Sequence, residues 1–251
     1  MASCIFEKYR DRLNSGNNQS GTISKEWDPD MFDAVIFDWD GTLADTRKFV
    51  LDSFQKVLKE IECNVSDEFI ARRIGIGARN TFKEALEARN LPFDEKTIDE
   101  LVKKKIEIQI ELTGNVNLFD GVVDLLSSLH KEVRMVLATM SNRMVIDKLI
   151  NEKEVGKYFD VIITADEVVQ PKPNPEVFLE SAMKLKCSPE RCVVVEDSVF
   201  GVRAAKEAGM RCIAIPSGAY SMKELKQQNP DLIVGSIKEK EKILNFILGR
   251  G

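Results

Sequence analysis

Histidine is nearly absent from this sequence, which contains one, His130, in 251 residues. His130 ends a run with the spacing of an amphipathic helix, so we expect it at the surface or at the C-cap of that helix. Catalytic triads and two-histidine zinc sites place histidine inside a site, and histidine phosphotransfer needs it as the acceptor. The histidine content therefore argues against all three.

Cysteines and long apolar runs are also scarce. The cysteines are scattered, odd in number and without the paired spacing of a metal or redox site, so we interpret them as reduced thiols that mostly fill the core. No apolar run approaches the length of a membrane span, and the N-terminus lacks the basic and then apolar layout of a secretion signal. We therefore expect a cytoplasmic protein without a membrane partner. The five cysteines are Cys4, Cys63, Cys187, Cys192 and Cys212.

An excess of positive charge is missing as well, since the formal net charge is -5 at pH 7. Nucleic-acid binding needs a basic surface that displaces counterions from phosphates, so we expect no nucleic-acid partner. A small anionic substrate is still compatible with this charge if a metal ion supplies the positive charge. The composition, 43% hydrophobic and 31% charged, indicates a globular protein of one or two domains.

The sequence does contain a series of short apolar runs separated by helical patterns. The first run, from Ala34 to Phe37, is unbroken, as in a strand buried on both faces of a parallel sheet. This alternation predicts an α/β fold with a doubly wound parallel sheet and right-handed crossovers. Further strands are expected at residues 133–138, 161–164, 192–195, 212–215 and 232–234, and helices at 122–129, 144–150, 175–185, 199–208 and 237–248.

Two segments depart from this alternation. Residues 46–116 have helical spacing without a strand-like run, which predicts a small all-helical cap domain inserted after the first strand. Residues 1–30 are polar apart from a short apolar pattern between Ile5 and Leu13, which suggests one or two helical turns and then a flexible N-terminal extension. The core domain would then consist of residues 31–45 and 117–251.

Polar residues follow each of the first strands. In open α/β sheets, ligands collect beyond the carboxyl ends of the strands, so these side chains are expected to meet at one edge. Four carboxylates there would repel one another and raise each other's pKa unless a cation intervened, and Mg²⁺ is the usual choice beside phosphate. The candidate site residues are Asp38, Asp40, Gly41 and Thr42 after the first strand, Thr139, Met140 and Ser141 after the second, then Lys172, and then Glu196 and Asp197.

Taken alone, each of these residues is more often an ordinary turn or loop residue. Taken together and in this order, they favour a catalytic interpretation. The chain resembles the haloacid dehalogenase superfamily, on its phosphatase and phosphomutase branch with a helical cap. All four signature motifs are present between Asp38 and Asp197, and the family fold would account for residues from 32 to the C-terminus.

The resemblance implies a role for each motif residue. Asp38 would be the nucleophile that attacks phosphorus and forms an aspartyl-phosphate, and Asp40 would protonate the leaving oxygen and then deprotonate water. Mg²⁺ would be held by the side chain of Asp38, the backbone carbonyl of Asp40 and the side chain of Asp197. Glu196 would be an outer or additional ligand.

The resemblance also suggests how the phosphoryl group would be bound. Thr139, its neighbouring amides and Lys172 would hold the phosphoryl oxygens and offset developing charge. The loop residues Gly41, Thr42, Met140 and Ser141 are expected to contact the substrate.

The cap contributes further candidates. A loop at residues 74–77 is expected to face the site, and Arg79 beside it would anchor a substrate carboxylate or second phosphate, with an ordinary surface charge as the equal alternative. The run Lys103-Lys104-Lys105 is typical of a solvated helix face, although one of the three could reach the site when the cap closes.

These features indicate a Mg²⁺-dependent phosphatase of a small phosphorylated metabolite, similar to phosphoglycolate or a sugar phosphate. The alternative is a mutase of the β-phosphoglucomutase type, but those relatives carry a histidine where this chain has Val50. A phospho-aspartate signalling receiver is a further alternative, yet receivers are much shorter, lack a helical insertion and order their acids differently. Either a monomer or a homodimer is compatible with the sequence.

Overall fold

The computed structural model describes residues 31–250. The helical turns predicted near the N-terminus, and Cys4, lie outside the described residues. The other four cysteines are buried free thiols, as predicted. Within residues 31–250, none of the helices combines the length and the apolar character needed to span a bilayer.

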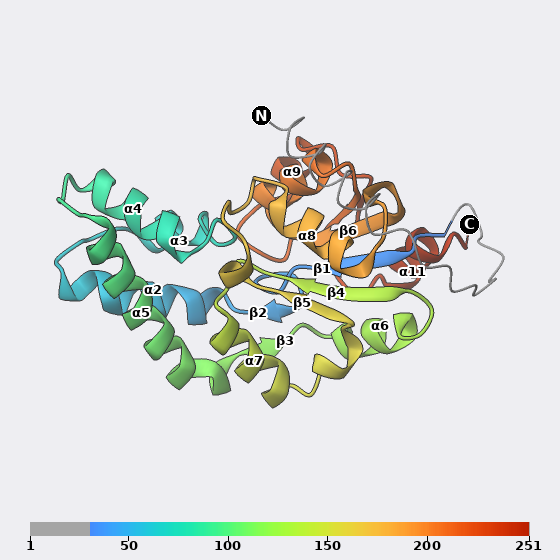
Figure 1. The fold of residues 1–251 in the computed structure, drawn as a ribbon, viewed down its shortest axis with the longest axis horizontal. Coiled ribbons are helices and arrows are strands. Elements are labelled where there is room, and N and C mark those ends of the chain that lie inside the picture. Colours follow the sequence, from blue (N-terminus) through green and yellow to red (C-terminus); the bar gives the residue numbers. More distant parts are fainter. Residues whose placement is uncertain (1–30, 251) are drawn as a thin grey trace.

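The core is a six-stranded parallel sheet covered by helices on both faces (Figure 1). The strand order β5-β4-β1-β6-β7-β8 is doubly wound, because the chain builds outward from β1 first on one side and then on the other. The fold class predicted from the alternating pattern is confirmed. The strands are β1 (Ala34–Phe37), β4 (Arg134–Ala138), β5 (Val161–Ile163), β6 (Cys192–Glu196), β7 (Arg211–Ala214) and β8 (Leu232–Ile233).

Alternate residues of each strand enter opposite layers of the core. In β1, Val35 and Phe37 pack with α6, α7 and α11, whereas Ala34 and Ile36 pack with α8 and α9 on the other face. Both faces of the strand are therefore apolar, which explains why its sequence is unbroken. The helices of the core are α6 (Val122–Leu129), α7 (Arg143–Glu152), α8 (Glu176–Leu185), α9 (Val199–Glu207), α10 (Met222–Lys226) and α11 (Lys240–Leu248).

Four helices between β1 and the rest of the sheet form a separate layer, which projects to one side of the core in Figure 1. Helix α5 packs on α2 and α4, and α2 packs on α3. The segment is all-helical, as its spacing predicts, and we call these four helices the cap. They are α2 (Arg47–Glu60), α3 (Asp67–Ala71), α4 (Ala78–Ala88) and α5 (Glu95–Leu112).

Two short strands carry the chain into and out of the cap. β2 (Ala44–Asp45) and β3 (Asn117–Leu118) pair antiparallel, with Ala44 opposite Leu118. These strands were not predicted, because two residues are too few to show a strand period and the partner lies more than 70 residues away.

The cap contacts the core again at the end of α3. The guanidinium of Arg72 donates to Glu224 of α10 over 2.6 Å and lies 4.7 Å above the ring of Tyr220. The hydroxyl of Tyr220 donates to the backbone carbonyl of Arg72 over 2.6 Å. We call these three residues the clasp. It joins the cap to the loop and helix that follow β7.

Candidate active site

The carboxyl ends of three central strands are level. Phe37 of β1 lies opposite Leu137 of β4 and Val195 of β6 in the parallel register. The residues that follow therefore emerge at one edge of the sheet, and Asp38 and Glu196 are among them. The convergence expected from the sequence is present in the structure.

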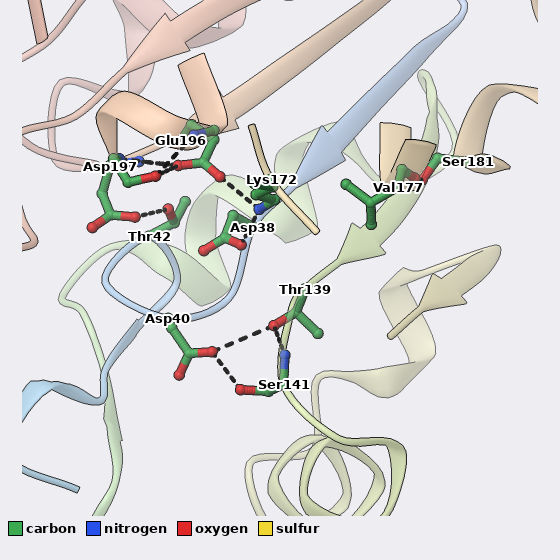
Figure 2. Close-up of polar contacts among 12 residues, drawn as sticks. Asp38, Asp40, Thr42, Thr139, Ser141, Lys172, Val177, Ser181, Glu196 and Asp197 are labelled. Atoms are coloured by element: carbon green, nitrogen blue, oxygen red, sulfur yellow. Dashed lines mark hydrogen bonds and ion pairs between the residues drawn. The ribbon is translucent and has the colours of Figure 1, made fainter. Parts of the chain in front are cut away.

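A buried ion-pair network lies at this edge (Figure 2). The ammonium of Lys172 donates to Asp38 Oδ1 and to Glu196 Oε1, each over 2.6 Å. Lys172 comes from the loop between β5 and α8, and its side chain is fully buried. A lysine held by two carboxylates from different strands is fixed in position, as a group that orients a reacting phosphate must be.

Glu196 is occupied on both oxygens. Its Oε2 accepts hydrogen bonds from the backbone N–H groups of Asp197 and Ser198 and from the Ser198 hydroxyl, each at 3.0 Å. The structure thus places Glu196 where it orients Lys172 and the turn that carries Asp197. The Asp197 carboxylate, in turn, accepts a hydrogen bond from the Thr42 hydroxyl over 3.2 Å.

Charge is not balanced within this group. Burial raises the pKa of Asp38 to about 8 against the attraction of Lys172, and the carboxylates of Glu196 and Asp40 raise it further. Burial together with Glu196 and Asp38 also raises the pKa of Asp197. Burial opposes the charge on Lys172, but its two carboxylate partners outweigh it and raise the pKa of the ammonium.

The donor set fits a hard divalent cation. Ligand oxygens of Asp38, Glu196 and Asp197 all lie within 4.8 Å of one another, and three carboxylates face a single ammonium. Since Glu196 is occupied by its own partners, Asp38 and Asp197 are the side chains best placed to bind Mg²⁺. When bound, the ion would supply the missing positive charge and a fixed point for phosphate oxygens.

Asp40 faces away from this cluster, toward the loop after β4 (Figure 2). Its Oδ2 accepts hydrogen bonds from the hydroxyls of Ser141, over 2.6 Å, and Thr139, over 3.4 Å. The backbone N–H of Ser141 donates to Thr139 Oγ1 over 3.1 Å, which fixes the loop. Asp40 Oδ1 is buried and has no partner among residues 31–250, so one oxygen of this carboxylate is not engaged in a hydrogen bond.

The residues expected to contact substrate divide into two groups. Met140 and Ser141 line a cleft beside Asp38 and Asp40. Thr42 is buried and directs its hydroxyl to Asp197, and Gly41 lies against the same carboxylate: a β-carbon at Gly41 would be 2.4 Å from Asp197 Oδ2. The first group therefore lines the cleft, and the second lies against the carboxylate of Asp197. The substrate-binding roles stay predictions.

Arg79 lies farther out. Its guanidinium forms ion pairs with Glu95 and Asp99 of α5, and its side chain is 44% exposed. Both carboxylates offset its charge, although Arg79 also lines the larger cleft between the cap and the core. That role remains a prediction.

Sequence reasoning did not single out Lys105 from its two lysine neighbours. Lys103 and Lys104 are exposed, as expected of a solvated face, whereas Lys105 is 6% exposed and lines the cleft that contains Asp38 and Asp40. The signal was present: Lys105 and Gln109 continue the buried stripe of α5 that begins with Ile98 and Leu101.

Comparisons with known proteins agree with this geometry. Residues 35–215 match the family model described as haloacid dehalogenase-like hydrolase. A phosphorylated carbohydrates phosphatase of Thermotoga maritima is 31% identical over 184 residues, which cover 72% of this chain and 83% of the relative. The protein CbbY of Rhodobacter capsulatus is 33% identical over 195 residues, 73% of this chain and 85% of the relative.

A solved structure shares the same architecture. The crystal structure of a β-phosphoglucomutase from Clostridium difficile superimposes with a TM-score of 0.74 at 26% identity, covering 85% of this chain and all of the other. The segment that matches the family model, residues 35–215, contains Asp38, Lys172 and Asp197 and spans the cap as well as most of the core. The chain therefore belongs to the haloacid dehalogenase-like hydrolase family.

Proposed function

We propose that the protein is a Mg²⁺-dependent phosphatase that hydrolyses a small phosphorylated metabolite through an aspartyl-phosphate on Asp38. The observation that carries the proposal is the junction of Asp38, Lys172, Glu196 and Asp197 at the carboxyl edge of the sheet. Relatives described as phosphatases support the reaction class. Four buried free thiols fit a reducing compartment, so we place the protein in the cytoplasm.

Asp38 is the nucleophile in this proposal. Lys172 binds its Oδ1, so we assign Oδ2 as the attacking oxygen. Lys172 is also close enough to offset negative charge on the phosphoryl group as it is transferred. Asp197, which accepts a hydrogen bond from Thr42, would bind the Mg²⁺ together with Asp38.

Asp40 transfers the protons. It gives one to the leaving oxygen as the P–O bond breaks, and it takes one from the water that then cleaves the aspartyl-phosphate. Asp40 Oδ2 accepts hydrogen bonds from Ser141 and Thr139, which hold the carboxylate in place. Among the described residues, Asp40 Oδ1 has no hydrogen-bond partner, and we assign the proton transfer to this oxygen.

The second candidate is a sugar-phosphate mutase, favoured by the similarity to β-phosphoglucomutase. Val50 argues for the hydrolase: it occupies the position where the mutases carry a histidine, and it lines the cleft beside Asp38 with an apolar side chain. The single histidine, His130, is exposed at the C-cap of α6, as predicted, and does not line that cleft.

Asp38→Asn tests the proposal. The amide keeps the shape but is not a nucleophile, so kcat should fall by roughly 10³-fold or more. The assay should follow phosphate release and isomerised product together, with sugar phosphates and two- to six-carbon phosphate esters as substrates. Asp52→Asn, an exposed change on α2, is the matched control. Near-normal turnover by Asp38→Asn would remove Asp38 as nucleophile, and isomerisation without phosphate release would establish the mutase.

A further inference from the structure

A cleft of about 320 Å³ separates the cap from the core. The smaller cleft that contains Asp38 and Asp40 joins it, since Lys105, Met140 and Ser141 line both. A substrate whose phosphate lies at Asp38 therefore has space for its organic part in the larger cleft. Most of the wall is apolar, with contributions from Ile76, Val102, Ile106, Val168, Val169 and Pro171.

Lys105 brings a buried positive charge to this space. Its Nζ donates to Gln109 Oε1 over 2.7 Å and lies 4.8 Å from the ring of Phe54, and it forms no ion pair with any carboxylate among residues 31–250. Burial lowers the pKa of Lys105 to about 8, while attraction to Asp40 opposes part of this change. A buried ammonium without a bonded counterion is unfavourable unless a ligand provides one.

The side-chain amide of Gln109 has an unpaired donor group. It is 1% exposed, its Oε1 accepts from Lys105, and its Nε2 has no partner in the part of the chain that the structure describes. Buried amide N–H groups are nearly always hydrogen-bonded, so a buried and unpaired amide that lines a cleft points to a ligand that accepts a hydrogen bond. Lys105 fixes the orientation of the amide, which directs Nε2 away from the ammonium.

We infer that Lys105 and Gln109 bind an anionic oxygen group, a carboxylate or a second phosphate, on the organic part of the substrate. This inference rests on the proposed function and narrows its substrate class to phosphate esters that carry a second anion. The pair presents N–H donors and one positive charge, so an uncharged hydroxyl would satisfy the donors but leave the charge unmatched. The apolar wall would pack against the carbon skeleton between the two anionic ends.

Paired substrates test the inference. 3-Phosphoglycerate and glycerol 3-phosphate share a three-carbon skeleton and differ in a terminal carboxylate, and glucose 1,6-bisphosphate and glucose 6-phosphate differ in a second phosphate. In at least one pair, kcat/KM should be roughly tenfold or more higher for the member with the extra anion. The pair that shows the preference identifies the group as carboxylate or phosphate.

Three variants assign the preference to this site. Lys105→Met and Gln109→Leu should abolish the preference through KM, so that kcat/KM becomes similar for the two members of the pair. Gln109→Glu should abolish it too, because the new carboxylate would pair with Lys105 and cancel its charge. Lys104→Met is the control, since Lys104 is an exposed neighbour on the same helix that pairs with Glu60.

A readout without turnover separates this inference from the proposed function. Calorimetric titration of Asp38→Asn with the same pairs measures affinity alone, before and after the Lys105→Met change. A Lys105-dependent preference in binding with no hydrolysis of any ester by the native enzyme would refute the phosphatase and leave this inference standing. Equal affinity for both members of each pair, or equal losses for both in Lys105→Met, would overturn it.

Discussion

At the residue scale, glycines decide where the carboxylate of Asp197, the proposed metal ligand, can lie. Asp197 Oδ2 is 2.4 Å from the place where a β-carbon on Gly41 would be and 1.7 Å from the corresponding place on Gly218. No real β-carbon lies so close to an oxygen, so the carboxylate occupies space that only glycine leaves open. Glu196 has the same relation to Gly201, where a β-carbon would lie 1.8 Å from Oε1.

Gly218→Ala should therefore displace Asp197 and weaken Mg²⁺ binding by roughly tenfold or more. The measurement is the Mg²⁺ concentration that gives half-maximal turnover. Gly114→Ala is a suitable control, because an added β-carbon there would meet no atom within 4 Å. An unchanged Mg²⁺ requirement in Gly218→Ala would show that Asp197 does not depend on this space.

Residues at strand ends could be predicted from the sequence, because an apolar run locates the strand and the polar residue after it must emerge at the edge. Asp38 and Asp197 are of this kind. The contribution of Gly218 could not be predicted, since it depends on how a distant loop lies against Asp197. The burial of Lys105 could have been predicted from the stripe of buried residues along α5, which includes Lys105 but not its two lysine neighbours. Neighbouring lysines are, however, ordinarily all solvated.

At the scale of elements, the clasp is one of the contacts that hold the cap on the core, and the packing of α5 on α7 is another. Arg72 and Glu224 are each more than a third exposed on their side chains, so the pair alone contributes modestly. The aromatic face of Tyr220 and its hydrogen bond to the Arg72 carbonyl add to it. Together they hold the residue that directly precedes the loop from Arg73 to Gly77, beside the active site.

Removing the clasp should loosen the cap. Arg72→Ala is expected to raise KM by roughly two- to fivefold with a smaller effect on kcat, because a cap that opens more readily binds substrate less firmly. Hydrogen exchange at residues 73–77 should increase in the same variant. The control is Arg47→Ala, which breaks a pair with Glu68 inside the cap. If exchange in this loop stayed at the native rate, the clasp would not be what holds the cap.

The clasp should persist across the working pH range. The hydrogen bond from Arg72 and those from Ser221 lower the pKa of Glu224 to about 2, below its ordinary value of 4.5. A lowered carboxylate pKa means that the stabilisation is fully present above the ordinary value and is lost as the pH falls toward about 2. Loss of activity in mildly acidic solution is therefore not expected to arise from this contact.

The sequence predicted the long elements better than the short ones. Helices with an apolar stripe and strands with an unbroken run were placed to within a few residues, as with α6 at Val122–Leu129. The last helix was expected from residue 237 but begins at Lys240. Ile237 belongs to the preceding loop, and it is buried at a position that happens to fit the helical spacing of the apolar residues. β2 and β3 depend on each other and show no local pattern.

At the scale of the whole molecule, the buried charge of Asp197 is expected to disfavour folding when no cation is bound. Burial and neighbouring carboxylates raise the pKa of Asp197, so its charge becomes a cost to stability as the pH rises above the ordinary carboxylate range. A metal ion that binds the folded state alone reverses this cost by mass action. Metal content should accordingly control stability as well as turnover.

EDTA should stop turnover and lower the Tm of the native protein, and Mg²⁺ in excess should restore both. Asp197→Asn should raise the Tm of EDTA-treated protein by roughly 2–4 °C, because it removes a buried charge, and should lose most of the response to Mg²⁺. Differential scanning calorimetry with and without Mg²⁺ measures both effects. A metal-free Asp197→Asn protein less stable than the metal-free native protein would contradict the charge argument, and activity indifferent to EDTA would contradict the metal site.

The paired strands β2 and β3 have a consequence for how such a protein can diversify. The chain leaves the core at Ala44–Asp45 and returns at Asn117–Leu118, and these two crossings are hydrogen-bonded side by side. The chain thus enters and leaves the cap at one narrow stem, and exchanging the segment between these crossings would leave the order of the six parallel strands intact. Reaction chemistry and molecular recognition can then be inherited as separate modules.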